Sequence, residues 1–194
     1  IIPLPPPPTY RGLNQIAVEV FSGFGPLLRD LGTAPNGMLL LNHLTLVTDM
    51  TKCAATLSQQ YPSIPIVLLT VTKTIYRGGV KTRTKCASIS KILDRMGSGP
   101  CIVIANRMSS RGVSFTSTDY SRHVTHQMIL SPTTVTSFLQ KCRIFGVYAP
   151  GTKTTLYVQQ EKDLVFIEKV RKVLRNKQLF LKPMLTTCLY TTSL

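Results

Sequence analysis

The stretch that decides the fold reads IVIANRMSSRGVSF and covers residues 102–115. Its first four residues, Ile102 to Ala105, form an apolar run that gives way to a turn-forming Asn106 and then to the polar residues Ser109 to Gly112. This pattern predicts a buried β-strand that leads into a polar loop at its carboxyl end. Ligands of open α/β sheets bind at that end of the strands, so the loop is a candidate functional segment.

A second informative segment, TSFLQKCRIFG, covers residues 136–146. It places Gln140 and Arg143 three positions apart, which puts both side chains on one face if the segment is helical. An amide and a guanidinium could then reach the same target.

At these two segments the chain resembles the second RecA-like domain of superfamily 2 helicases and translocases. The SRG at 110–112, after an apolar strand, is similar to motif V of that family, and the QKCRIFG at 140–146 is similar to its motif VI. The form QxxRxFG is closest to Z1-type ATPase domains and to helicase-like replication proteins of large DNA viruses. It departs from the common form of motif VI, QxxGRxxR, in having one arginine. The resemblance spans roughly residues 36–158.

The resemblance implies a RecA-like α/β domain, with a mostly parallel twisted sheet flanked by helices, that contributes to an ATP site. Arg143 would be the catalytic arginine finger, and Gln140 would orient the nucleotide or Arg143 itself. Gly112 would let the backbone approach the nucleotide closely, with Arg111 beside it. ATP and Mg²⁺ would be bound mainly by an N-terminal RecA-like domain of the same protein.

The same resemblance places nucleic acid near residues that follow strands, namely Asn42, His43, Ser109 and Ser110. A hydrogen-bonded loop residue is the plainer interpretation of His43. We add Lys73 and Arg77 because segment 72–85 carries five cations and no acid, which creates a positive field. A solvated hairpin is the alternative interpretation of that segment.

The composition of the chain points to a folded, basic protein. It has 194 residues, of which 43% are hydrophobic, and 23 Lys and Arg against 8 Asp and Glu give a net charge of +15. Neutralising phosphates releases counterions, so single-stranded or duplex nucleic acid is the expected partner. The resemblance to replication proteins favours DNA. The apolar runs fall short of the roughly 20 residues that span a bilayer, so we expect no transmembrane helix and no membrane partner.

Hydrophobic patterning predicts alternating strands and helices along the chain, which is typical of a parallel sheet with right-handed crossovers. We expect a proline-rich arm or linker at 1–10, a RecA-like domain at 11–160, and a C-terminal helix and tail packed on it at 161–194. The N-terminal IIPLPPPP reads as the cut end of a longer protein. Strands are predicted at 37–41, 64–72, 101–105, 127–130 and 156–158, and helices at 48–60, 88–96, 133–143 and 161–180.

The sequence lacks the signatures of a complete hydrolase. It contains no Walker A loop, since the GTKT at 151–154 separates Gly from Lys, and no acidic box that could hold magnesium. His123 and His126 stand three apart without an evident third ligand, so we expect no metal site. The five cysteines form no CxxC pair and are expected to be free buried thiols in a reducing compartment.

Together these observations favour the C-terminal motor domain of an ATP-dependent helicase or translocase that is inactive on its own. The resemblance suggests viral DNA replication inside the cell, in the host cytoplasm or nucleus. The alternative is a stand-alone basic nucleic-acid-binding protein of ribosomal or nucleocapsid type without catalysis. A third possibility, an endonuclease, is not supported, because the sequence contains no cluster of carboxylates.

Overall fold

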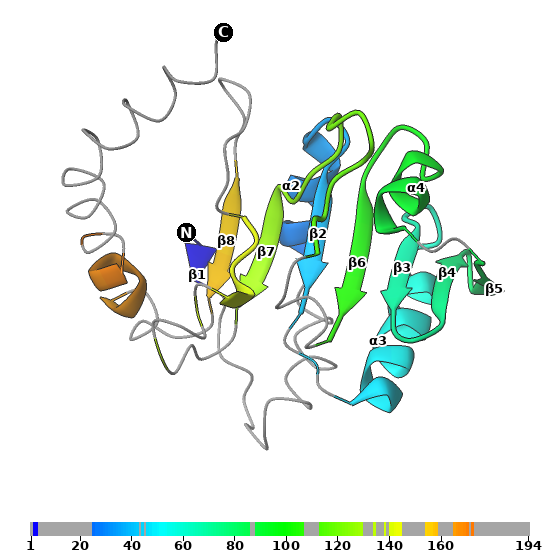
Figure 1. The fold of residues 1–194 in the computed structure, drawn as a ribbon, viewed down its shortest axis with the longest axis horizontal. Helices are drawn as coiled ribbons and strands as arrows, with labels where there is room; N and C mark the ends of the chain where they lie inside the picture. Colours follow the sequence, from blue (N-terminus) through cyan, green and yellow to red (C-terminus); the bar gives the residue numbers. More distant parts are fainter. Residues whose placement is uncertain are drawn as a thin grey trace, which may run out of the picture.

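The computed structural model of the chain describes residues 2–3, 25–42, 44, 46–85, 88–106, 113–129, 134, 138, 140–144, 154–158, 165–170 and 172. Its centre is an eight-stranded sheet in the order β1-β8-β7-β2-β6-β3-β4-β5 (Figure 1). In chain order the elements are β1 (Ile2–Pro3), α2 (Gly25–Thr33), β2 (Met38–Leu41), α3 (Val47–Gln60), β3 (Ile66–Leu69), β4 (Lys73–Arg77), β5 (Val80–Arg83), α4 (Ile89–Asp94), β6 (Cys101–Ala105), β7 (His126–Ile129) and β8 (Thr155–Val158).

Most of the strand pairs are parallel. Strands β1, β8, β7, β2, β6 and β3 all pair in parallel, and only β4 and β5 run antiparallel to their neighbours. The connection from β2 to β3 is a crossover through α3, whereas β3 and β4 are joined by the short segment 70–72, which can only reverse the chain. The predicted α/β class, with a mostly parallel sheet flanked by helices, is confirmed, and the arrangement is compatible with a RecA-like domain.

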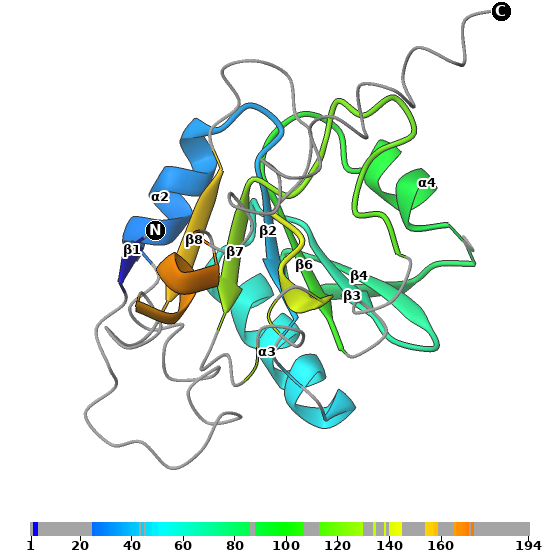
Figure 2. The same ribbon diagram turned by 60° about the vertical axis from the view of Figure 1, so that its left-hand side comes forward.

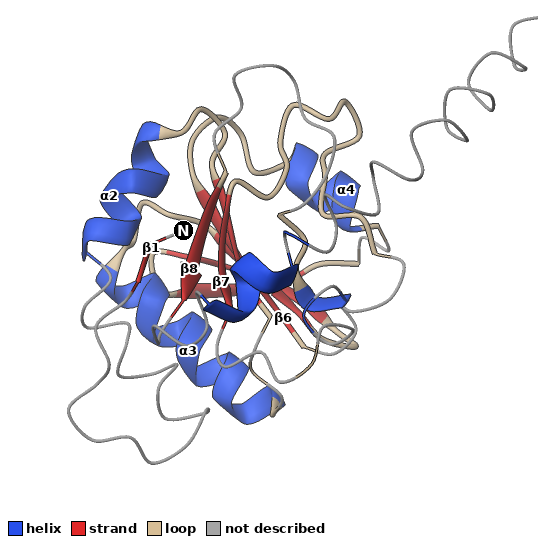
Figure 3. Cartoon of the chain, turned by 90° about the vertical axis from the view of Figure 1, so that its left-hand side faces the viewer, coloured by secondary structure: helices blue, strands red, loops and turns tan. Residues whose placement is uncertain are grey.

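The central strands are buried on both faces because helices cover the sheet from both sides (Figures 2 and 3). All residues of β2 and β6 are buried, which explains their unbroken apolar sequences. Alternate residues of a strand enter different cores. Leu39 faces α2 and α3, with Leu31 and Leu57. Leu40 faces α4, with Ile92, and the helical residues 165–170, with Ile167. Each such side chain contributes about 1.5–3 kcal/mol when fully buried.

Most predicted elements agree with the structure where it describes them, but the helix predicted at 133–143 is shorter: residues 138, 140 and 141 are helical, whereas Thr134, Cys142 and Arg143 are not. The helix at 48–60, the strand at 101–105 and the helix at 88–96 correspond to α3, β6 and α4. Strand β3 ends at Leu69, earlier than predicted, because residues 70–72 form the turn into β4. Strands β4 and β5 form a hairpin, which was the alternative interpretation of segment 72–85. Residues Ile2 and Pro3, within the predicted arm, pair with β8 at the margin of the sheet, where a proline without an N–H is tolerated.

Three cysteines test the prediction of free buried thiols. Cys53, Cys101 and Cys142 are free and buried, which confirms it for these three. Burial raises the pKa of the Cys53 and Cys101 thiols, so both remain protonated at neutral pH. Among the helices that the structure describes, none has the length and apolar character needed to cross a membrane.

Candidate functional site

A cavity of about 410 Å³ lies at the carboxyl edge of the sheet, where β3 and β6 end side by side. Leu69 and Ala105, the last residues of these two strands, form part of its wall. Ile89 of α4 and Phe115 add apolar surface, and Lys73 of β4 contributes an ammonium group. The position matches the edge at which open parallel sheets bind ligands.

The polar part of this cavity consists of Lys73 and of hydroxyl groups. Thr70, Ser88, Ser90 and Ser114 all line it. The Thr70 hydroxyl donates a 2.6 Å hydrogen bond to the carbonyl of Thr72. With an apolar wall, several hydroxyls and one half-buried cation, the cavity suits a ligand that combines an apolar portion with an anionic or hydroxylated portion.

The predicted loop at 106–112 starts and ends at this cavity. Ala105, immediately before the loop, and Val113, immediately after it, both line the cavity. Asn106 is half-buried. The candidate residues Ser109, Ser110, Arg111 and Gly112 lie outside the described residues, so their positions relative to Arg143 stay a prediction.

A network of amide side chains joins β2 and β7 to the segment that carries Arg143. Gln127 of β7 is fully buried, and its Nε2 donates to the carbonyl of Lys141 at 2.7 Å and to Asn42 Oδ1 at 3.2 Å. Its Oε1 accepts from the backbone N–H groups of Arg143, at 2.7 Å, and Ile144, at 3.1 Å. Asn42 Nδ2 donates a second bond to the Lys141 carbonyl, at 2.7 Å. The backbone at 141–144 is therefore held against the sheet by four hydrogen bonds to three of its groups.

The network gives the predicted residues definite places. Lys141 is helical, and its carbonyl, at the carboxyl end of the helical residues, takes side-chain donors in place of a helical one. Arg143 follows the helical residues, and its N–H donates to Gln127. Gln140 is exposed and Arg143 is half-buried. Asn42 is only 6% exposed and its amide bonds internally, so in this structure it positions the Arg143 segment instead of presenting a surface to nucleic acid.

Gln127 was not among the residues that sequence reasoning selected. The available signal was a glutamine at the start of the predicted strand at 127–130, because a buried amide requires several hydrogen-bond partners. His43, which follows Asn42 in the chain, lies outside the described residues.

Lys73 and Arg77 lie at opposite ends of β4. Lys73 lines the carboxyl-edge cavity, whereas Arg77 is at the amino edge and its Nη2 donates to the carbonyl of Arg95 at 3.3 Å. Four residue steps along a strand separate the two, about 13 Å. The structure thus places Lys73 near the candidate site and does not place Arg77 there.

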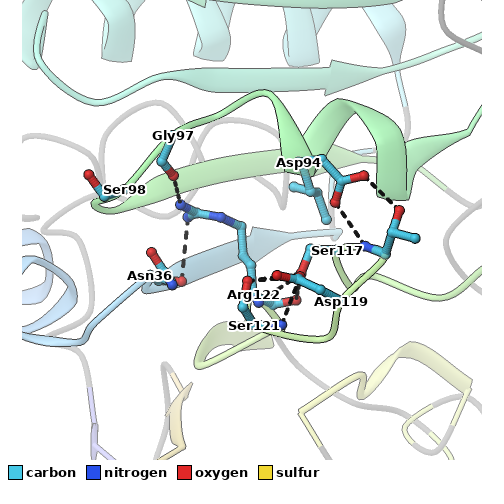
Figure 4. Close-up of a pocket in the computed structure, with 10 residues that line it drawn as sticks. Asn36, Asp94, Gly97, Ser98, Ser117, Asp119, Ser121 and Arg122 are labelled. Carbon is cyan, nitrogen blue, oxygen red and sulfur yellow. Dashed lines mark hydrogen bonds between the residues drawn. The ribbon is translucent and has the colours of Figure 1, made fainter.

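A second cavity, of about 560 Å³, lies at the amino edge of the sheet and was not predicted (Figure 4). Arg122, 2% exposed, lines it, and its guanidinium donates to the Gly97 carbonyl at 2.6 Å and to Cys101 Sγ at 3.2 Å. Arg122 also reaches the carbonyls of Asn36 and Gly37, each at 3.4 Å, so it ties together the connections that precede β2, β6 and β7.

The carboxylates of the same cavity are occupied by neighbouring groups. Asp94 accepts from the backbone and the hydroxyl of Thr118, at 2.8 and 2.6 Å. Asp119 accepts from Ser117 and Ser121, which lowers the pKa of its carboxyl to about 2. These bonds order the loop before β7, and we interpret the Arg122 cavity as structural.

The two described histidines have different neighbours in the structure. His126 Nε2 lies 3.1 Å from Asp30 Oδ2, and its Nδ1 lies 2.8 Å from the Thr125 hydroxyl. The backbone of His123 forms an isolated antiparallel β-bridge with Thr116. Across the described residues, no group of three or more His, Cys, Asp or Glu side chains could hold a metal ion. Burial lowers the pKa of both imidazoles, against the opposing effect of Asp30 on His126.

Comparison of the chain with protein-family models, with curated proteins and with solved structures found no match. The function is therefore inferred from the carboxyl-edge residues themselves.

Proposed function

We propose that this chain is the C-terminal motor domain of an ATP-dependent nucleic-acid helicase or translocase. In this proposal ATP lies between the carboxyl edge of the sheet and an N-terminal RecA-like domain, which supplies the phosphate loop and the acids that bind Mg²⁺. The observation that carries the proposal is the clamp on the Arg143 segment: Gln127 and Asn42 bind its backbone beside the end of β2.

Rigid positioning is what an arginine finger requires. Its guanidinium stabilises negative charge that spreads over the phosphoryl oxygens in the transition state, and this effect depends on placement before the reaction starts. The Gln127 bonds to the N–H groups of Arg143 and Ile144 supply such placement at the backbone. The SRG segment at 110–112, which lies in sequence between the cavity-lining residues Ala105 and Val113, would contribute the second nucleotide contact.

The nucleic-acid partner is supported by the net charge of +15 and by Lys73 at the candidate site. DNA replication of a virus, within the host cell, is the setting suggested by the sequence resemblance.

The test is steady-state ATP hydrolysis by a protein that contains this domain together with its N-terminal RecA-like partner. Arg143→Ala should lower kcat by about 10³-fold or more, because the guanidinium acts on the transition state. The control is Lys141→Ala, which removes a neighbouring exposed cation and keeps the carbonyl that Gln127 binds. This chain alone should not hydrolyse ATP. An unchanged kcat for Arg143→Ala would contradict the proposal.

The second candidate is a stand-alone basic nucleic-acid-binding protein, which the net charge of +15 also favours. The two candidates differ in whether ATP and ADP change the affinity for an oligonucleotide. A motor domain joined to its partner should release or tighten on an oligonucleotide when ATP is exchanged for ADP, and this response should require Arg143. A structural binding protein should bind equally with either nucleotide and with Arg143→Ala.

A further inference from the structure

The β4–β5 hairpin forms the outer edge of the sheet, beyond β3. All four residues of β5, Val80 to Arg83, are exposed. Lys81 lies opposite Tyr76 and Arg83 lies opposite Thr74, and both β4 partners are buried. Lys81 and Arg83 therefore project from the same face of the hairpin, about 7 Å apart, a spacing comparable with that between neighbouring phosphates of an extended strand.

The hairpin is held in place at both ends. At its turn, the N–H of Gly79 donates to the Ser58 hydroxyl of α3 at 2.8 Å. At the other end, the N–H of Thr84 donates to the Lys73 carbonyl at 3.0 Å. The exposed Lys85 follows at once, so the cations at 81, 83 and 85 form a row that leads toward the carboxyl edge of the sheet. The Lys81 ammonium lies 6.0 Å from the centre of the Tyr76 ring, which favours an ordered position.

The lack of any compensating acid separates a binding surface from ordinary protection of a sheet edge. Edge strands often carry single charged residues, lysine above all, that discourage pairing with other strands. Here seven cations and no acid occur between Asp49 and Asp94. Within the described residues, no ion pair involves Lys81, Arg83 or Lys85. The surface is therefore an uncompensated positive field.

We propose that the row formed by Lys81, Arg83 and Lys85 binds the sugar-phosphate backbone of a nucleic-acid strand and directs it toward the carboxyl edge of the sheet. The proposal deepens the proposed function and rests on it for the nature of the partner. It assigns the contact to the exposed strand β5, in addition to Lys73, and it makes the contact independent of base sequence.

The test is the salt dependence of binding to a fluorescent single-stranded DNA oligonucleotide and to RNA of the same sequence, measured by anisotropy with the chain alone. The triple variant Lys81→Gln, Arg83→Gln, Lys85→Gln should reduce the slope of log Kd against log salt concentration by about 2, since each contact contributes roughly 0.7. At about 0.1 M salt this corresponds to binding that is about 100-fold weaker. The control variant Arg29→Gln, Lys169→Gln, Lys172→Gln removes three exposed cations elsewhere and should change the slope much less.

The outcomes are distinguishable. An equal fall in slope for both triple variants, or no fall for the β5 variant, would overturn the assignment to β5 while leaving nucleic-acid binding in place. Failure of the unmodified chain to bind either oligonucleotide would instead count against both proposals. Binding to anionic phospholipid vesicles is measured for the same proteins. If the β5 triple variant lost binding to the vesicles but bound both oligonucleotides as the unmodified chain does, the partner would be a membrane surface and this proposal would be overturned. The altered side chains are exposed, so the unfolding temperature should not change.

Discussion

Gln127 shows how one buried amide can organise a candidate site. Its oxygen and nitrogen serve two N–H groups and two acceptors at the same time, so nearly all of its hydrogen-bonding capacity is used. A buried group that loses its partner incurs the full desolvation cost, about 1–3 kcal/mol. The amide therefore links the stability of the domain to the placement of Arg143.

Gln127→Leu should lower the free energy of unfolding by about 2–4 kcal/mol, because the N–H groups of Arg143 and Ile144 lose their acceptor. Chemical denaturation with urea measures the change. Gln59→Leu, on the exposed face of α3, is the matched control and should stay within about 0.5 kcal/mol. A loss below about 0.5 kcal/mol for Gln127→Leu would mean that the amide network is not needed for stability.

His126 should make the stability of the protein depend on pH. Burial lowers its pKa in the folded state below the ordinary value of 6.5, although Asp30 opposes the effect. As the pH falls through 6.5 the unfolded chain takes up the proton first, so stability is complete above this pH and declines below it, by at most about 1.4 kcal/mol per pH unit for each histidine. His123, whose pKa is also lowered by burial, adds to the decline.

Urea denaturation at about pH 7.5 and about pH 5.5 tests this effect. The unmodified chain should be less stable at the lower pH, and His126→Gln should show a smaller difference between the two conditions. His123→Gln removes the other contribution. An undiminished pH dependence in the variant that lacks both imidazoles would rule out these residues as its cause.

At the scale of elements, the turn between α2 and β2 requires a residue without a side chain. A Cβ on Gly37 would lie 2.6 Å from the Leu31 carbonyl oxygen and 3.1 Å from the Ala34 side chain. The Gly37 carbonyl also accepts from the N–H of Cys101, so this turn sets the register between β2 and β6. A backbone shift here would disturb both strands.

Gly37→Ala should therefore lower the free energy of unfolding by about 1–3 kcal/mol. Gly32 provides a control of opposite sign: it lies in α2, a Cβ there meets nothing within 4 Å, and alanine is favoured over glycine in a helix by up to about 1 kcal/mol. Thermal unfolding followed by circular dichroism distinguishes the two. Equal effects of the two substitutions would show that the close contact at Gly37 is relieved without cost.

At the scale of the whole molecule, the carboxyl and amino edges of the sheet are separate surfaces, although one basic segment of the sequence supplies cations to both. Lys73 and Arg77 belong to one basic segment, yet they reach opposite edges of the sheet because an extended strand carries them apart. Arg122, in a polar stretch with no distinctive pattern, is almost fully buried and joins three connections. Charge in a sequence segment thus indicates a partner class but not the face that meets it.

The sequence by itself determined the α/β class, most element positions and the positive charge, because hydrophobic periodicity and composition are local properties that a short window reveals. It also indicated the segments around residues 110 and 143 as candidates. The tertiary structure alone decided that Asn42 and Gln127, 85 positions apart, meet beneath the Arg143 segment. Contacts over such separations depend on the order of the strands, since β7 lies beside β2 only after the chain has passed through β3 and β6. Local patterns do not encode that order.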